Sequence, residues 1–78
     1  MKAYILINVQ MGMTQEILRN LKNLADVQSA EMTFGEYDII AVVQTDDLTR
    51  LAKLVSNDIQ PIPGITHTAT CMAVDISA

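Results

Sequence analysis

The 78-residue chain has a single cysteine, only five basic residues and no tryptophan. One cysteine cannot form an internal disulfide, so the fold does not depend on a disulfide framework. The five lysines and arginines stand against nine acidic residues, which gives a formal net charge of −4. The chain therefore lacks the clustered positive charge that attracts phosphate backbones and anionic membranes. We expect neither direct nucleic-acid binding nor a membrane partner.

Long apolar runs and secretion signals are also absent from the sequence. A bilayer-spanning helix needs roughly 20 consecutive apolar residues, and a signal peptide needs a basic segment before a shorter apolar one. These absences favour a cytoplasmic location. No repeat, low-complexity tract or linker divides the sequence, so residues 1–78 are expected to form a single domain.

Hydrophobic residues are abundant, at 50% of the chain. A domain of this size buries only about 60% of the surface that its unfolded chain exposes. Apolar surface is therefore expected to remain outside the core of one molecule. This mismatch predicts self-association.

The first half of the chain carries two strand signals around a helix signal. Residues 3–9 are apolar on both faces except at Asn8, as in a central strand. Thr14 is a favourable N-cap for a helix with an apolar stripe at the 3.6-residue spacing. Residues 27–33 form a more polar strand, typical of a sheet edge. The expected buried stripe of the helix is Ile17, Leu18, Leu21 and Leu24.

The second half repeats this order. Residues 39–44 read as a strongly apolar strand, and Asp46 and Asp47 supply the cap and the first-turn acid of a second helix. Pro61 ends that helix, because proline lacks the N–H that a helix interior needs. Residues 66–76 then form the last strand. The expected buried stripe of the second helix is Leu48, Leu51, Ala52, Val55 and Ile59.

The element order βαββαβ predicts the overall architecture. Two right-handed crossovers give a four-stranded antiparallel sheet in the order 4-1-3-2, with both helices on one face. This is the ferredoxin-like α+β sandwich. Two helices cover only one face, yet the first and third strands are apolar on both. We therefore expect an identical sheet to cover the open face in a two-fold dimer.

Residues for metal binding or catalysis are few. His67 and Cys71 point to the same face of the last strand, but roughly 13 Å of strand separates them and no second histidine or cysteine completes a site. Neither a nucleophile–base set nor a phosphate-binding glycine loop is present. We expect no metal, no cofactor and no catalytic residue. Cys71 is interpreted as a buried small hydrophobe and His67 as a partly exposed strand residue.

The segment Gly35-Glu36-Tyr37-Asp38 lies between two predicted strands. A zwitterionic ligand needs a carboxylate for its ammonium and unpaired N–H groups for its carboxylate, and a glycine permits close approach. The same residues are also acceptable hairpin chemistry. Thr68 and Thr70 on the last strand are a second polar set, which β-strand propensity alone also explains. In a ring of dimers, adjacent subunits can close both sets into one pocket.

Two motifs, Gly35 to Asp38 and Ile62-Pro63-Gly64-Ile65, occur in an order and spacing that point to a known family. Together with the first strand, Leu48-x-x-Leu51 and the two threonines, they resemble the effector domain of the Lrp/AsnC transcription regulators. This domain is called RAM, for regulation of amino acid metabolism, and the resemblance covers residues 2–76. It implies sheet-to-sheet dimers, rings that are commonly octamers, and an amino acid or related metabolite bound between dimers.

The resemblance also implies roles for individual residues. Gly35 would offer its backbone N–H, Asp38 would bind the ammonium, and Glu36 and Tyr37 would shape the rim. Thr68 and Thr70 would complete the pocket.

The sequence departs from the family pattern in three places. The helix-turn-helix domain of full-length members does not precede the first strand, which suggests a stand-alone form that acts on transcription indirectly, in association with full-length regulators. Phe34 replaces a residue that is often small and hydroxylated. Met11 stands where proline is common.

Three functions are compatible with this sequence. The favoured one is a non-enzymatic amino-acid sensor that assembles into oligomers. A small dimeric ferredoxin-like enzyme is the alternative, with only His67, Tyr4 and Asn8 as polar groups for its pocket. A ligand-free oligomerisation module is the third.

Overall fold

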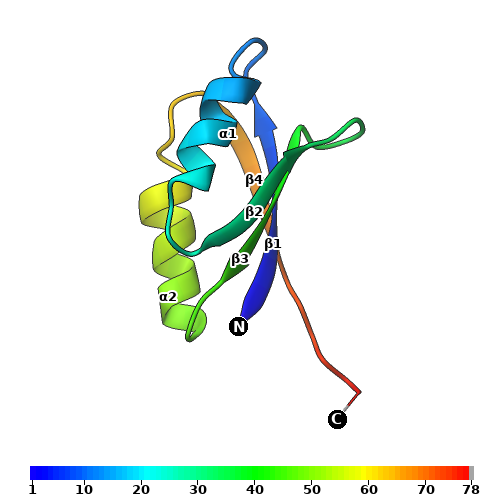
Figure 1. Cartoon of the computed structure of the whole chain (residues 1–78), viewed down its shortest axis with the longest axis vertical. Coiled ribbons are helices and arrows are strands. Elements are labelled where there is room, and N and C mark those ends of the chain that lie inside the picture. Colours follow the sequence, from blue (N-terminus) through cyan, green and yellow to red (C-terminus); the bar gives the residue numbers. More distant parts are fainter. Residues whose placement is uncertain (78) are drawn as a thin grey trace.

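The computed structural model describes residues 1–77 and shows a curved sheet with both helices on one side (Figure 1). All strand pairs are antiparallel, in the order β2-β3-β1-β4. This confirms the predicted ferredoxin-like α+β fold and its strand order. The strands are β1 (Lys2–Val9), β2 (Val27–Met32), β3 (Ile39–Gln44) and β4 (Ile65–Met72). The helices are α1 (Thr14–Lys22) and α2 (Leu48–Lys53), and α2 continues as the π-helix η1 (Leu54–Ile59).

The core lies between the helices and one face of the two central strands. Alternate residues of a strand point to the same face, and in β1 and β3 these residues are fully buried. They pack on apolar side chains from both helices and from β2. The buried core residues are Ala3, Ile5, Ile7, Ile17, Leu21, Ala30, Ile39, Ala41, Val43, Leu51, Leu54 and Ile59.

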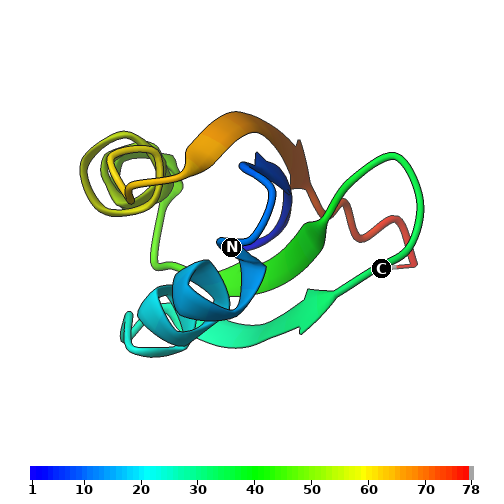
Figure 2. The ribbon, with the colours of Figure 1, turned by 90° about the horizontal axis from the view of Figure 1, so that it is seen from above.

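The opposite face of the sheet is also apolar. Leu6 lies opposite Ile40 of β3 and Ala69 of β4, and all three are only partly buried. Figure 2 shows both helices on the other side of the sheet. Within residues 1–77, no helix covers this surface, which we call the open face. It consists of Tyr4, Leu6, Ile40, Val42, Ala69 and Cys71.

The exposure of Cys71 corrects one sequence prediction. Cys71 pairs with Tyr4, so its side chain lies on the open face and is exposed rather than buried. The prediction relied on the usual burial of cysteine, whereas strand alternation decides which face this residue occupies.

The two helix starts differ from each other. Thr14 does not cap α1; it is the first helical residue, and Met13 precedes it without a side-chain cap. The prediction of a threonine cap is therefore wrong. At α2, the Asp47 carboxylate accepts a hydrogen bond from the Arg50 N–H at 2.8 Å, so Asp47 is the cap and no acid lies in the first turn, one residue later than the predicted cap at Asp46. The Arg50 side chain also forms a 2.8 Å ion pair with Asp26, and this contact raises the pKa of Arg50.

The second helix does not keep the 3.6-residue stripe that its sequence predicts. Leu48 is 55% exposed and Ala52 is exposed, whereas Leu54 is buried. The backbone widens after Lys53, where the Gln60 N–H donates to the Val55 carbonyl at 2.8 Å. This five-residue spacing is typical of a π-helix and shifts which side chains face the core. Leu48 and Ala52 are left beside β4.

The last strand ends at Met72, not at Ile76 as the sequence predicted. Its final bond to β1 joins the Ala73 N–H to the Lys2 carbonyl at 2.9 Å, and β1 begins at Lys2. Beyond this point the chain lacks a neighbouring strand among the described residues. Val74 and Ile76 are therefore 78% and 90% exposed.

Gly64 is required by both backbone conformation and packing. Its φ is +95°, and an added Cβ would lie 2.7 Å from the Met13 Sδ and 3.0 Å from the Ile17 Cδ1. Gly12 has a similar φ of +87° but open space around it. We expect Gly12→Ala to cost about 1–2 kcal/mol of stability from the left-handed conformation. Gly64→Ala should cost about 1 kcal/mol more because a half-buried methionine must move.

Urea unfolding of the two alanine variants measures this difference directly. Equal losses of stability would show that contact with Met13 and Ile17 does not matter.

Candidate functional site

The loop of residues 33–38, between β2 and β3, is held by hydrogen bonds at both ends. The Thr33 N–H donates to the Asp38 carbonyl at 3.0 Å, and the Thr33 hydroxyl donates to the Tyr37 carbonyl at 2.7 Å. The Asn8 amide of β1 donates to the Glu36 carbonyl at 2.9 Å. These bonds fix the loop against the sheet, so its polar groups have a defined geometry before a ligand arrives.

One oxygen of the Asp38 carboxylate accepts a hydrogen bond within the chain, and the other is left to accept one from a ligand. Its Oδ2 accepts a hydrogen bond from the Val9 N–H at 2.9 Å, and the Asp38 N–H donates to the Ile7 carbonyl at 2.9 Å. Within residues 1–77, its Oδ1 has no hydrogen-bond donor. The half-buried carboxylate thus anchors the loop and still presents an acceptor to a cationic group.

Gly35 lies at the tip of this loop. Its φ of +146° is in a region that disfavours other residues, and it is exposed. Its N–H makes no hydrogen bond within the described chain. Phe34 is fully exposed at 108%, Glu36 is exposed, and Tyr37 is half-buried. The loop therefore offers a backbone donor, a carboxylate acceptor and an aromatic side chain in one short segment.

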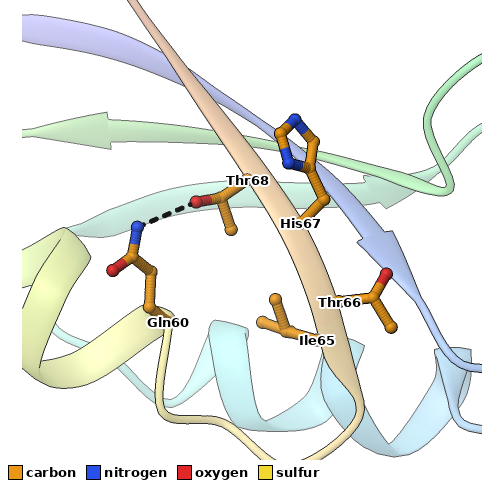
Figure 3. Close-up of a pocket in the computed structure, with 5 residues that line it drawn as sticks. All are labelled: Gln60, Ile65, Thr66, His67 and Thr68. Carbon is orange, nitrogen blue, oxygen red and sulfur yellow. Dashed lines mark hydrogen bonds between the residues drawn. The ribbon is translucent and has the colours of Figure 1, made fainter.

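The structure places Thr68 and Thr70 away from this loop. They pair with Ile7 and Ile5, whose side chains face the helices, so both threonines lie on the helix side of the sheet. The Thr68 hydroxyl accepts a hydrogen bond from the Gln60 amide at 3.1 Å (Figure 3). The loop projects on the other side of the sheet (Figures 1 and 2). A single chain therefore does not bring the two predicted sets together.

Two hollows lie along β4. The smaller, of about 280 Å³, lies at the start of the strand, where the side chain of His67 points away from that of Gln60 (Figure 3). The larger, of about 520 Å³, lies between β4 and α2. Gln60 lines both hollows, and its amide donates to the Thr68 hydroxyl. We call the larger hollow the β4 groove, and its walls are Leu48, Leu51, Ala52, Val55, Ser56, Gln60, Thr70 and Met72.

The β4 groove was not predicted from the sequence. The available signal was the set of apolar residues Leu48, Ala52 and Val55 on the second helix, which were assigned to the core. Among residues 1–77, no cluster of three histidine, cysteine or acidic side chains is arranged to hold a metal ion. No helix in this range is long and apolar enough to cross a membrane.

Comparisons with known proteins agree with the fold and the motifs. The family model of the Lrp/AsnC ligand binding domain matches residues 2–76. The crystal structure of FFRP-DM1 is similar, with 33% identity, a TM-score of 0.90, and coverage of 94% of this chain and 97% of that one. No match was found among curated proteins.

Two longer structures share the fold. AsnC of E. coli has 26% identity and a TM-score of 0.91, and the match covers 99% of this chain and 52% of AsnC. The chain thus spans about half the length of AsnC. The regulator NMB0573 of Neisseria meningitidis, solved as a complex with L-Met, has 14% identity and a TM-score of 0.87, with coverage of 99% and 51%. The match over residues 2–76 and the similarity to FFRP-DM1 show that this chain belongs to the Lrp/AsnC ligand-binding domain family.

Proposed function

We propose that this chain is a non-enzymatic effector module that binds an amino acid or a related small metabolite and modulates transcription regulation indirectly. The observation that carries the proposal is the 33–38 loop, which is held by hydrogen bonds and contains both the Asp38 carboxylate and the exposed Gly35 backbone. The family assignment supports a ligand-binding role, and the L-Met complex of NMB0573 supports the chemical class of the ligand.

Recognition would use the two charged ends of the ligand. Its ammonium would donate to the Asp38 Oδ1, and its carboxylate would accept from the Gly35 N–H. Each charge-assisted hydrogen bond contributes roughly 1.5–3 kcal/mol. Glu36 and Tyr37 would form the rim. Phe34 would contact the ligand side chain and favour an apolar one.

The pocket would be completed by another subunit. Thr68 and Thr70 lie on the helix side of their own chain, so they can reach the loop only from a neighbouring molecule. The open face would pair with the open face of a second copy, because it is apolar and no described element covers it. Such dimers would assemble further into a ring, and an octamer is the expected size. Full-length Lrp/AsnC regulators are the proposed partners, which implies a cytoplasmic location.

Cys71 reports on the proposed sheet-to-sheet dimer, because it is the only cysteine and lies on the open face. We expect its reaction with a maleimide to be slow in concentrated protein and to accelerate on dilution, as the dimer dissociates. Absorbance or mass spectrometry follows the labelling rate.

The control for this measurement is a thiol on the outer side of α1, in the variant Cys71→Ser/Gln15→Cys. That thiol should react quickly at every concentration, since Gln15 is exposed and remote from the sheet. If Cys71 reacted as quickly as the control thiol in concentrated protein, the open face would not be the dimer interface.

Calorimetric titration with each standard amino acid tests ligand binding itself. We expect one or a few to bind with a stoichiometry of one per loop. Absence of binding by all of them, in a folded oligomer, would favour a ligand-free oligomerisation module instead.

A further inference from the structure

His67 lies on the same side of the sheet as the 33–38 loop. It pairs with Asn8 of β1, and residues directly opposite each other in two strands have their side chains on the same face. Ile7 is buried on the helix side, so the neighbouring Asn8 points to the other side, and His67 points there with it. Figure 3 shows the imidazole directed away from Gln60, in agreement with this placement.

Asn8 connects His67 to the loop. The Asn8 amide donates to the Glu36 carbonyl at 2.9 Å, so the loop lies against the Asn8 side chain. Cross-strand neighbours have Cβ atoms about 4.5–5.5 Å apart, which places the His67 ring beside the same amide. The imidazole and the loop backbone therefore flank one side chain of β1.

Asp38 lies beside Asn8 on its other flank. The Asp38 N–H donates to the Ile7 carbonyl and its carboxylate accepts from the Val9 N–H, and these two residues stand on either side of Asn8. His67, Asn8 and Asp38 thus cross the sheet in one row, which we call the polar row. Two strand spacings, about 10 Å, separate the Cα atoms at its ends. A small molecule can lie over Asn8 and contact both end residues.

His67 is the only side chain at this end of the sheet, among the described residues, that can carry a positive charge. Lys2 is at the far end of β1, where its ammonium lies 5.3 Å from the centre of the Tyr4 ring. The other four basic residues belong to the two helices on the opposite side of the sheet: Arg19, Lys22, Arg50 and Lys53. A zwitterion at the loop would find a carboxylate for its ammonium in Asp38. For its own carboxylate, the one cation within reach is a protonated His67.

The groups around His67 leave its ring free to take this role. The loop supplies the titratable groups Glu36, Tyr37 and Asp38, and β1 supplies the neutral Asn8. On its own strand, Cys71 shares the face but lies about 13 Å away. Within residues 1–77, His67 is exposed and its ring makes no hydrogen bond or ion pair. No described positive charge opposes its protonation.

We propose that His67 is a ligand-binding residue of the effector site and that its imidazolium supplies the positive charge for the carboxylate of the amino acid. The ligand would lie over Asn8, with its ammonium at the Asp38 Oδ1 and its carboxylate between the Gly35 N–H and the His67 ring. The inference rests on the proposed function and adds a pH dependence to it.

The sign of this dependence follows from the chemistry of the ring. A charged donor binds a carboxylate about twice as strongly as a neutral one. Histidine is the side chain that ordinarily gains or loses its charge between about pH 5 and pH 8. Affinity should therefore rise as the pH falls through this range, and binding should take up a proton.

Calorimetric titration of the wild type with each standard amino acid, at about pH 5.5 and at about pH 8, tests this sign. We expect every amino acid that binds to bind about 5- to 10-fold more tightly at the lower pH. In His67→Gln, the affinity should be equal at the two pH values and close to that of the wild type at the higher one. His67 is exposed, so this variant should fold, and circular dichroism checks it.

The matched control is the double variant His67→Gln/Gln15→His. It restores a histidine on the exposed side of α1, remote from the polar row, and should bind as His67→Gln does at both pH values. A pH dependence that returned in this double variant would show that any exposed histidine produces it, and would overturn the role of His67.

Proton NMR of the imidazole gives a second readout, because His67 is the only histidine in the chain and its ring signals need no further assignment. A saturating amino acid should raise the pH midpoint of the ring titration by up to about one unit, which corresponds to the tenfold change in affinity. An unchanged midpoint with the amino acid bound would overturn the proposal.

The outcomes separate this inference from the proposed function. Amino-acid binding that weakens in Asp38→Asn but is independent of pH in the wild type would overturn the role of His67 and leave the effector module standing. Binding of no amino acid at either pH would overturn both.

Discussion

The variant Asp38→Asn should retain the fold and lose most of its affinity for an amino acid. The asparagine oxygen can still accept the hydrogen bond from the Val9 N–H, so the loop keeps its anchor. The negative charge that faces the ligand ammonium is lost, however. Removal of a charge-assisted hydrogen bond costs roughly 1.5–3 kcal/mol, which corresponds to about a 10- to 150-fold weaker affinity. Calorimetric titration of both proteins with the same amino acid measures this loss.

Asp38→Ala separates the two roles of the carboxylate. It should lose the ligand in the same way, leave the dimer intact, and also unfold more easily, because the Val9 N–H loses its acceptor at a cost of about 1–3 kcal/mol. Asp46→Asn is the control, since this exposed carboxylate lies outside the 33–38 loop and the proposed pocket. Equal affinity of Asp38→Asn and the wild type for the amino acid would show that the Asp38 carboxylate does not bind the ligand.

Leu6→Asp should abolish association through the open face and lower the mass in solution. Leu6 lies at the centre of this face, between Ile40 and Ala69. Two-fold symmetry would bury two copies of the new carboxylate in one apolar interface. Burial of an unpaired charge costs several kcal/mol per ion, so we expect this contact to be lost. Light scattering coupled to size-exclusion chromatography measures the mass.

The monomer itself should tolerate this substitution. The Leu6 side chain lies outside the buried core and is only partly covered by its own chain, so the carboxylate can remain hydrated. Gln15→Asp adds the same charge on the exposed side of α1 and should leave the mass unchanged. If Leu6→Asp also kept the wild-type mass, association would have to use another surface.

The fold could be predicted from local patterns because each central strand has one consistent apolar face. Ile5 and Ile7 lie opposite Thr70 and Thr68 on one side of β1 and opposite Ala41 and Ile39 on the other, as the βαββαβ order requires. The bounds of β3 agree with the predicted range of residues 39–44. These features depend on strand alternation, which a sequence displays directly.

The second helix was harder to predict, because a π-turn leaves no simple pattern in the sequence. A 3.6-residue stripe that includes Leu48 assigns Leu48 and Ala52 to the core, whereas both are exposed and line the β4 groove, and Leu54 is buried instead. Likewise, the end of β4 depends on where β1 begins, not on the strand propensity of Val74 and Ile76.

The candidate site could be predicted only in part. Gly35 and Asp38 were identified from composition and family motifs, and the structure shows how Asn8 and Val9 hold their loop. The bond from Val9 joins residues 29 positions apart, so no local pattern indicates it. Thr68 and Thr70 were predicted to meet the loop through adjacent subunits, and strand alternation puts them on the opposite side of the sheet from the loop of their own chain. Only an assembly of several chains can bring these threonines to the 33–38 loop.

The most direct test of the central claim is thermal unfolding of the pure protein with each standard amino acid, with the solution mass recorded alongside. A ligand at about a hundred times its dissociation constant should stabilise the folded state by roughly 2.7 kcal/mol, a shift of many degrees for a domain this small. We predict this shift for one or a few amino acids, in an oligomer, and its loss in Asp38→Asn. An oligomer whose unfolding temperature responds to none of the amino acids would contradict an amino-acid effector module.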